Sequence, residues 1–365
     1  MNPSIFRKRI AKVRRSMAAE GVEALLVTRL ANIRYLTAFT GSSALVVIGP
    51  GFLHFLTDGR YRIQAVEQVG AADVGAEITV YGNSALSELL RDLVRSHEIS
   101  TLHVEAESTS WSMVLQLRRW LSGTKLQPSA GIIERVRASK DAEELASLSK
   151  AASVTSAAFK ALLGQLRPGM SEIDVALLLE DELQRRGSEG WAFDPIVAAG
   201  PRGALPHAMP SVSRIRKGDF VVIDFGCRVD GYCSDMTRTV AVGNPPAELV
   251  QAYKAVKRAN ELARAEVAAG RSADRIDAAA REWLTGRGYG SLFVHSTGHG
   301  LGLEVHEWPR IGRGASDRIP LNCVLTIEPG CYIPGLGGVR IEDMVVAERG
   351  GSRLLTKVSR ELVVL

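Results

Sequence analysis

The amino-acid sequence predicts two domains, an α/β domain followed by an α+β domain. A chain of 365 residues is too long for one ordinary hydrophobic core and is comfortable for two. Up to residue 136, short apolar strand patterns alternate with helical patterns, which is typical of α/β layers. Beyond a polar connection at 137–141, a long amphipathic helix begins, and pairs of helices then precede groups of strands.

In the first domain, predicted over residues 1–134, each element follows from its periodicity and from the turn residues that bound it. Apolar residues at helical spacing predict a helix over 3–20, which Gly21 ends. Gly49-Pro50-Gly51 and Asp58-Gly59 are turn signals between short apolar strands. The further elements predicted are strands 24–28, 44–48, 54–57, 77–81, 101–105 and 131–136, and helices 60–69, 84–97 and 109–121.

The second domain is predicted over residues 135–365. Its first helix keeps its apolar residues on one stripe and stops at Pro168-Gly169. Two helices followed by strands occur twice, which predicts a repeat of structure within this domain. The elements predicted are helices 141–166, 171–187, 246–269 and 272–286, and strands 191–198, 220–242, 292–295, 323–328 and 339–347.

Composition narrows the class of protein. With 46% hydrophobic and 23% charged residues, the chain resembles ordinary soluble globular proteins. We expect a cytoplasmic protein without a membrane partner, because there is no apolar run of about 18 residues and no secretory signal. The four cysteines form no CxxC pair, which predicts reduced, buried thiols. The basic residues of the first helix predict a solvated helix face rather than a nucleic-acid site: Arg7, Lys8, Arg9, Lys12, Arg14 and Arg15.

Two aspartates are predicted to lie on one face of a hairpin. Asp224 ends an apolar strand, and the chain returns past Asp235 after a turn at Asp230-Gly231, a strong hairpin signal. A two-residue turn places Asp235 opposite Gly226, with Asp224 diagonal to it. Carboxylates held so close repel each other, and a divalent cation removes that cost. The alternative is a carboxylate at a strand end and a second one in a solvated hairpin.

Further candidate ligands lie in the last third of the chain. Glu328 and Glu342 each follow apolar strand residues, where a glutamate is costly unless it is coordinated or paired, for example with Arg340. His299 lies in a stretch, 296–307, whose glycines exclude a regular helix and let the backbone approach something compact. Carboxylates and imidazole suit Mn²⁺, Co²⁺, Zn²⁺ or Fe²⁺. Two divalent ions would balance the four carboxylates.

Five residues, in this order and in these contexts, resemble the metal ligands of pita-bread metallopeptidases: Asp224, Asp235, His299, Glu328 and Glu342. This family includes methionine aminopeptidases, Xaa-Pro aminopeptidases and prolidases. Residues 234–239, 297–302 and 327–330 also match its motifs. Residues 32–42 and 57–61 resemble the creatinase-type, RNase H-like N-terminal domain, which methionine aminopeptidases lack. The resemblance therefore implies this domain followed by a pita-bread catalytic domain.

The resemblance also implies roles. Asp224 would chelate one ion, Asp235 and Glu342 would bridge two ions, and His299 with Glu328 would complete the coordination of the other ion. Glu328 would also carry a proton from a bridging hydroxide to the leaving amine. The implied substrate-binding residues are His207, His295, His306 and Arg340, of which His207 and His306 would be catalytic, His306 by binding the scissile carbonyl. Mn²⁺ is the expected metal, with Co²⁺ or Zn²⁺ as alternatives, and a homodimer is expected.

The expected reaction is removal of the N-terminal residue that precedes proline in peptides. The N-terminal stretches favour an Xaa-Pro aminopeptidase, and an Xaa-Pro dipeptidase (prolidase) is the alternative. A creatinase-like amidinohydrolase shares the fold but lacks the metal ligands, all five of which are present here. A catalytically inactive peptide-binding module is the alternative from a different class.

Overall fold

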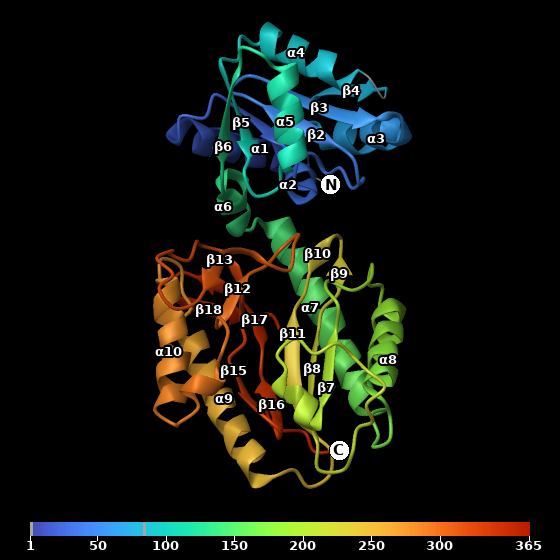
Figure 1. Ribbon diagram of the computed structural model, residues 1–365, viewed down its shortest axis with the longest axis vertical. Coiled ribbons are helices and arrows are strands. Elements are labelled where there is room, and N and C mark those ends of the chain that lie inside the picture. Colours follow the sequence, from blue (N-terminus) through green and yellow to red (C-terminus); the bar gives the residue numbers. More distant parts are fainter. Residues whose placement is uncertain (1–2, 83–84) are drawn as a thin grey trace. The chain divides into compact units, whose positions relative to one another are not determined.

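The computed structural model describes residues 3–82 and 85–365, which divide into two compact units, Met1–Arg137 and Ala138–Leu365 (Figure 1). We call them unit 1 and unit 2. The predicted boundary between 134 and 135 falls within helix α6, Ile132–Ala138. None of the helices in the described ranges is both long enough and apolar enough to cross a membrane.

Unit 1 is built on one six-stranded sheet, in the order β4-β3-β2-β1-β5-β6. The pairs β1–β2 and β2–β3 are antiparallel, and β3–β4, β1–β5 and β5–β6 are parallel. Helices surround this mixed sheet, so the predicted α/β class of the first domain is confirmed. The strands are β1 Ala24–Val27, β2 Leu45–Ile48, β3 Leu53–Asp58, β4 Glu77–Tyr81, β5 Thr101–Glu105 and β6 Lys125–Ser129. The other helices are α1 Pro3–Ala19, α2 Leu30–Thr37, α3 Arg62–Ala72, α4 Leu86–Ser96 and α5 Trp111–Trp120.

The strand predicted at 131–136 is wrong, because these residues belong to helix α6. The helix has Glu134 in its first turn and Arg135 and Arg137 in its last, an order that suits the helix dipole. The sixth strand is instead β6, which sequence patterns missed because it contains Pro128. Proline is tolerated there because β6 lies at the sheet edge. The helix predicted over 84–97 corresponds to α4, and its first residue lies outside the described residues.

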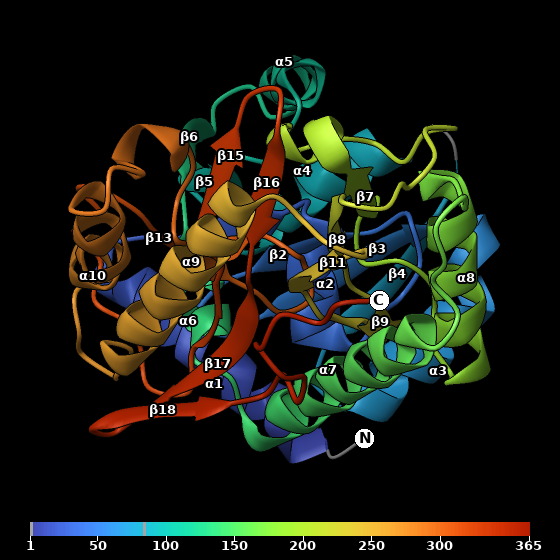
Figure 2. The same ribbon diagram turned by 90° about the horizontal axis from the view of Figure 1, so that it is seen from below.

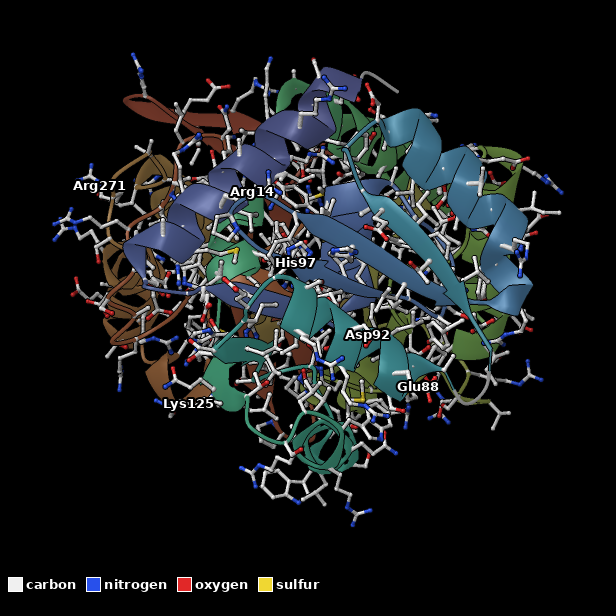
Figure 3. All side chains as sticks on the ribbon, turned by 90° about the horizontal axis from the view of Figure 1, so that it is seen from above. Arg14, Glu88, Asp92, His97, Lys125 and Arg271 are labelled. Carbon is white, nitrogen blue, oxygen red and sulfur yellow. The ribbon has the colours of Figure 1, made fainter. Side chains whose placement is uncertain are left out.

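The sequence predicts that the basic face of α1 is solvated, but two of its arginines contact other residues of unit 1. Arg9 is buried, and its guanidinium lies over the rings of Phe6 and Tyr35. Arg14 donates hydrogen bonds to the carbonyl oxygens of Gly49 and Phe52, 2.9 Å each, at the turn between β2 and β3. Figure 3 shows Arg14 on this helix, with Glu88 and Asp92 on α4. Part of the basic cluster therefore stabilises unit 1 itself.

Unit 2 has two halves, each with a helix pair. In the first half, α7 Ala142–Leu163 and α8 Glu172–Arg185 pack on the sheet β11-β8-β7. In the second, α9 Ala247–Ala265 and α10 Ala273–Thr285 pack on the sheet β13-β12-β14-β17-β18. Figure 2 shows α7 and α8 on one side of unit 2 and α9 and α10 on the other. The predicted α+β class is confirmed, with the order of helix pair and strands occurring twice.

The strands of the first half are β7 Ile196–Ala199, β8 Phe220–Phe225, β9 Arg228–Val229, β10 Tyr232–Cys233 and β11 Met236–Ala241. Those of the second half are β12 Gly298–Gly300, β13 Glu307–Ile311, β14 Val324–Ile327, β15 Gly330–Ile333, β16 Gly337–Arg340, β17 Asp343–Glu348 and β18 Gly351–Leu354. The strand predicted at 292–295 is absent. Arg281 of α10 binds the carbonyl oxygens of Phe293 and His295 there, in place of a neighbouring strand. The strand predicted at 191–198 begins only at Ile196, after Pro195.

Candidate metal centre and active site

The hairpin that carries the two aspartates forms as its sequence predicts. Asp230 and Gly231 both have positive φ, 51° and 77°, which is typical of the two-residue turn that suits strand twist. The register pairs Tyr232 with Val229 before Asp235 and Met236 with Phe225 after it. Asp235 therefore lies opposite Gly226, diagonal to Asp224, and the two carboxylates face the same side.

The other three candidate ligands come from strands, or from residues next to strands, in the second half. His299 is in the middle of β12, Glu328 directly follows β14, and Glu342 lies between β16 and β17. The glycines around His299 allow a close approach of the backbone, since Gly298, Gly300 and Gly302 do not have positive φ. A Cβ on Gly298 would lie 1.9 Å from the carbonyl oxygen of Thr326. Glycine is needed there so that β12 can lie against β14.

All five side chains line one cavity of about 590 Å³. Ligand atoms of Asp235, His299 and Glu342 lie within 4.8 Å of one another, and this is the one such group of three among the described residues. His299 Nε2 is 3.7 Å from Asp235 Oδ2 and 3.5 Å from Glu328 Oε1. The sequence-predicted ligands, from strands up to 118 positions apart (Asp224 to Glu342), are therefore brought together.

The donor set fits divalent cations. Asp224 Oδ1 and Glu342 Oε1 are buried and accept no hydrogen bond within the described residues. Buried oxygens without a donor are rare, because they lose hydration without compensation. Four carboxylates and one imidazole are the hard and borderline ligands that such ions prefer. These residues could hold divalent ions without rearrangement of the strands that carry them.

The electrostatics of the metal-free cluster show how strongly it needs a cation. Burial, followed by repulsion from neighbouring carboxylates, raises the pKa of Asp235 and that of Glu342 well above their ordinary values. Burial also raises the pKa of Glu328 to about 8, although Arg340 opposes the shift. Burial lowers the pKa of His299 to about 4, so its imidazole is neutral at pH 7 and able to ligate.

Arg340 connects several residues of the cluster through its hydrogen bonds. Its Nη2 donates to Asp224 Oδ2 at 2.5 Å, and its Nε donates to the hydroxyl of Thr237 at 3.1 Å. That hydroxyl donates in turn to Glu342 Oε2 at 2.8 Å. Arg340 Nη1 donates to the carbonyl oxygen of Pro206 and to the hydroxyl of Tyr332. The guanidinium is buried and engaged by protein groups, and its contacts orient the candidate metal ligands Asp224 and Glu342, while its predicted contact with substrate stays a prediction.

His295 reaches the cavity wall with both ring nitrogens engaged. Its Nδ1 is 2.7 Å from the carbonyl oxygen of Ser296, which can only accept, so Nδ1 carries the proton. Its Nε2 then accepts from the Tyr332 hydroxyl at 2.8 Å. Burial lowers the pKa of His295 to about 4, which keeps the ring neutral. Tyr332, which sequence reasoning missed, connects this histidine to Arg340; its place four residues after Glu328 was the available signal.

Two further histidines face the cavity. His306 and His207 both line it, and the ring of His306 lies 4.4 Å from that of His299, centroid to centroid. Burial, with a smaller effect of His207, lowers the pKa of His306. Further apolar and charged side chains line the cavity, and the sequence analysis assigned none of them a role: Phe193, Asp194, Ile196, Met209, Val305, Glu307 and Arg310.

Comparisons with known proteins agree with this geometry. Residues 146–349 match metallopeptidase family M24, and residues 9–139 match the creatinase/prolidase N-terminal domain. An uncharacterized peptidase of Bacillus subtilis, YqhT, is 40% identical over 98% of this chain and 100% of its own. The chain belongs to metallopeptidase family M24.

Solved structures of two similar proteins share the whole fold. An Xaa-Pro dipeptidase from Bacillus anthracis has a TM-score of 0.94 at 37% identity, covering 99% of this chain and 100% of its own. An X-Pro aminopeptidase from Thermotoga maritima has a TM-score of 0.87 at 34% identity, covering 96% and 100%. The predicted order of a creatinase-type domain and a pita-bread M24 domain is confirmed. Membership of this metallopeptidase family implies divalent metal ions.

A buried ion pair shapes the loop that carries His306 in this M24 chain. The Nζ of Lys140 lies 2.9 Å from Glu307 Oε2, and their side chains are 0% and 5% exposed. The Glu307 carboxylate also accepts the backbone N–H of Glu304 at 3.2 Å. A Cβ on Gly302 would lie 2.6 Å from this carboxylate, so glycine makes room for it. The loop 302–307 is therefore folded around one carboxylate that Lys140 neutralises.

We expect Lys140→Met to destabilise the protein by about 3–5 kcal/mol, because it leaves the Glu307 carboxylate buried without its cation. Activity should fall as well, because His306 directly precedes Glu307. Denaturant unfolding of Lys140→Met, Glu307→Gln and the double variant measures the coupling. The double variant should lose less stability than the sum of the single losses. Strict additivity would show that the pair does not act as a unit.

The raised carboxylate pKa values predict how the metal-free M24 chain responds to pH. Glu328 has an ordinary pKa of 4.5 that burial raises to about 8. Between these values the folded state binds the proton that the unfolded state releases, so the free energy of unfolding should fall as pH rises. Thermal unfolding of EDTA-treated protein from pH 7 to pH 8 tests this, because His299 and His295, whose pKa values are lowered to about 4, change stability only below the ordinary pKa of histidine, 6.5. Glu328→Gln, or added Mn²⁺, should reduce the fall, and a metal-free Tm that rises over this range would contradict the assignment.

Proposed function

We propose that the chain hydrolyses the peptide bond before proline and that Xaa-Pro dipeptides are its preferred substrates. Sequence patterns favour an Xaa-Pro aminopeptidase, and both activities appear in the names of the similar proteins. The observation that favours the dipeptidase is the position of Arg310. A guanidinium in the cavity wall, on the strand that pairs with the His299 strand, suits a substrate that ends in a carboxylate directly after proline.

Arg310 lies directly opposite His299 in the pairing of β13 with β12. Residues paired in this way have side chains on the same face of the sheet. Arg310 is exposed, and its Nε donates to the Ser296 hydroxyl at 2.8 Å. No described carboxylate forms an ion pair with it. Its remaining N–H groups can bind a carboxylate in the two-pronged geometry that arginine favours.

Five residues would hold the metal ions in this proposal: Asp224, Asp235, His299, Glu328 and Glu342. Two divalent ions balance their charge, and Mn²⁺, Co²⁺ or Zn²⁺ suits the donors, with Mn²⁺ expected. When bound, such ions supply Lewis acidity and make a coordinated water nucleophilic at neutral pH. Glu328 holds and transfers a proton at its carboxylate, which its raised pKa suits.

The remaining groups bind and orient the peptide. His306 is neutral at pH 7 because burial lowers its pKa, and its N–H is suited to the carbonyl oxygen as negative charge develops there. His207 lines the same cavity from the first half of unit 2 and would orient the substrate there. The apolar side chain of Val305 in the cavity wall suits a proline ring, whose tertiary amide offers no N–H.

An inactive peptide-binding module is the less favoured alternative. All five ligands are present and their ligand atoms converge, whereas a binding module would not need them. An Xaa-Pro aminopeptidase is the nearer alternative, because its cavity would need the same ligands and the same proline wall. The homodimer and the cytoplasmic location stay predictions.

The dipeptidase proposal predicts that the substrate's terminal carboxylate contributes to catalysis. We expect kcat/KM for Met-Pro to exceed that for Met-Pro amide by about 10- to 100-fold, the effect of a charge-assisted hydrogen bond. Arg310→Leu should remove this preference, whereas Arg353→Leu, at an exposed arginine in β18, should not. Equal hydrolysis of Met-Pro and Met-Pro-Ala-Ala, unaffected by Arg310→Leu, would favour the aminopeptidase. No hydrolysis with Mn²⁺ or Co²⁺ added would favour the binding module.

His306 should contribute to the transition state but not to metal binding. We expect His306→Ala to retain the metal content of the unmodified enzyme and to lose about 10²–10³ in kcat, as removal of one oxyanion donor does. Metal analysis and steady-state kinetics on Met-Pro measure both quantities. His97→Ala, in unit 1, is the matched control and should keep kcat. A His306→Ala enzyme with normal kcat would refute the role.

A further inference from the structure

Asp194 is a charged group in the cavity wall to which neither the predicted metal site nor the proposed reaction assigns a role. Its carboxylate is exposed and lines the same cavity as the candidate metal ligands. Within residues 3–82 and 85–365 it forms no hydrogen bond or ion pair with another side chain. A carboxylate that neighbouring groups do not neutralise is available to a cation that enters the cavity.

The backbone explains why Asp194 faces the cavity. Asp194 precedes Pro195, and a residue before proline is driven into an extended conformation. In an extended chain, residues two apart point to the same side. Ile196, two residues later, is paired directly with Asp224 in β8 and also lines the cavity. Asp194 lies two residues before Ile196, roughly 7 Å away along an extended chain, and lines the same cavity as Asp224.

The two charged side chains in the cavity wall indicate the direction in which a peptide substrate would lie. Arg310 belongs to the sheet that carries His299, and Asp194 precedes the sheet that carries Asp224. If Arg310 binds the terminal carboxylate, as the proposed function requires, proline lies over β12 and β13. The residue before proline then lies over β7 and β8, on the side of Asp194.

The distance of Asp194 from the candidate metal ligands indicates which positively charged group of the substrate it can bind. The α-amino group is one bond from the Cα next to the scissile carbonyl, so it lies close to Asp224 and the other ligands. A carboxylate roughly 7 Å along the chain from Ile196, which pairs with Asp224, is beyond that group. It is within reach of a lysine or arginine side chain, whose aliphatic part can pack on the neighbouring Met209 and Phe193.

We propose that Asp194 is a specificity-determining residue that binds the cationic side chain of a lysine or arginine preceding proline. This assignment rests on the proposed cleavage before proline. Acidic residues at the same substrate position are disfavoured, because their carboxylate meets that of Asp194. Since Asp194 is exposed, its contribution is that of a solvated ion pair and weakens with added salt.

The test compares substrates that differ in charge but little in length: Lys-Pro, Met-Pro and Glu-Pro. We expect Asp194→Asn to lower the ratio of kcat/KM for Lys-Pro to that for Met-Pro by about fivefold, as for an exposed ion pair. Asp194→Lys should shift the preference further, towards Glu-Pro. Glu248→Gln is the matched control, because it removes one exposed carboxylate on α9 outside the cavity and should leave the ratio unchanged.

The outcomes separate this proposal from the reaction on which it rests. Equal losses for Lys-Pro and Met-Pro in Asp194→Asn would overturn it, because Asp194 would then act on a group that both substrates share. An unchanged ratio in Asp194→Asn and Asp194→Lys would overturn it as well. Failure of the unmodified enzyme to cleave Met-Pro with metal present would instead refute cleavage before proline, and this inference with it.

Discussion

Four buried carboxylates around one small volume repel each other, and the catalytic unit is built around that repulsion. Burial and mutual repulsion raise the pKa values of Asp235 and Glu342, and burial raises that of Glu328. Asp224 and Glu342 each keep a buried oxygen for which the described residues supply no donor. Divalent cations would remove this cost, which a neutral ligand would not.

The fold meets this constraint by joining two similar halves. The first half supplies Asp224 and Asp235 from one hairpin, and the second supplies His299 from within β12 and Glu328 and Glu342 from beside strands. Hydrogen bonds cross between the halves, from Arg340 to Asp224 and from Thr237 to Glu342. Because these bonds orient metal ligands, the two halves must pack correctly before the metal site has its geometry. Metal binding and the folding of unit 2 are therefore coupled.

The cavity beside the metal ligands has a charge pattern that complements a short peptide. Arg310 lies on the face of His299, and Asp194 lines the same cavity as Asp224. In the proposed function, a zwitterionic substrate aligned between them would place its scissile bond over the candidate ligands. His306 is held at this position by the loop around Glu307, whose charge Lys140 neutralises. Substrate binding, substrate orientation and charge balance in the cavity would thus depend on a few charged side chains, some buried and some exposed.

The sequence by itself determined the candidate ligands, the hairpin register and both domain classes, because each leaves a local pattern: a turn at Asp230-Gly231, or a carboxylate after an apolar strand. It misassigned 131–136 as a strand, since a short apolar run does not distinguish a buried helix turn from an edge strand. Only the tertiary structure decided which side chains surround the ligands. Arg310, Asp194, Tyr332 and Lys140 gain their roles from strand pairing and from burial between segments distant in sequence. No local periodicity records such contacts, because they form only when the two halves of unit 2 pack together.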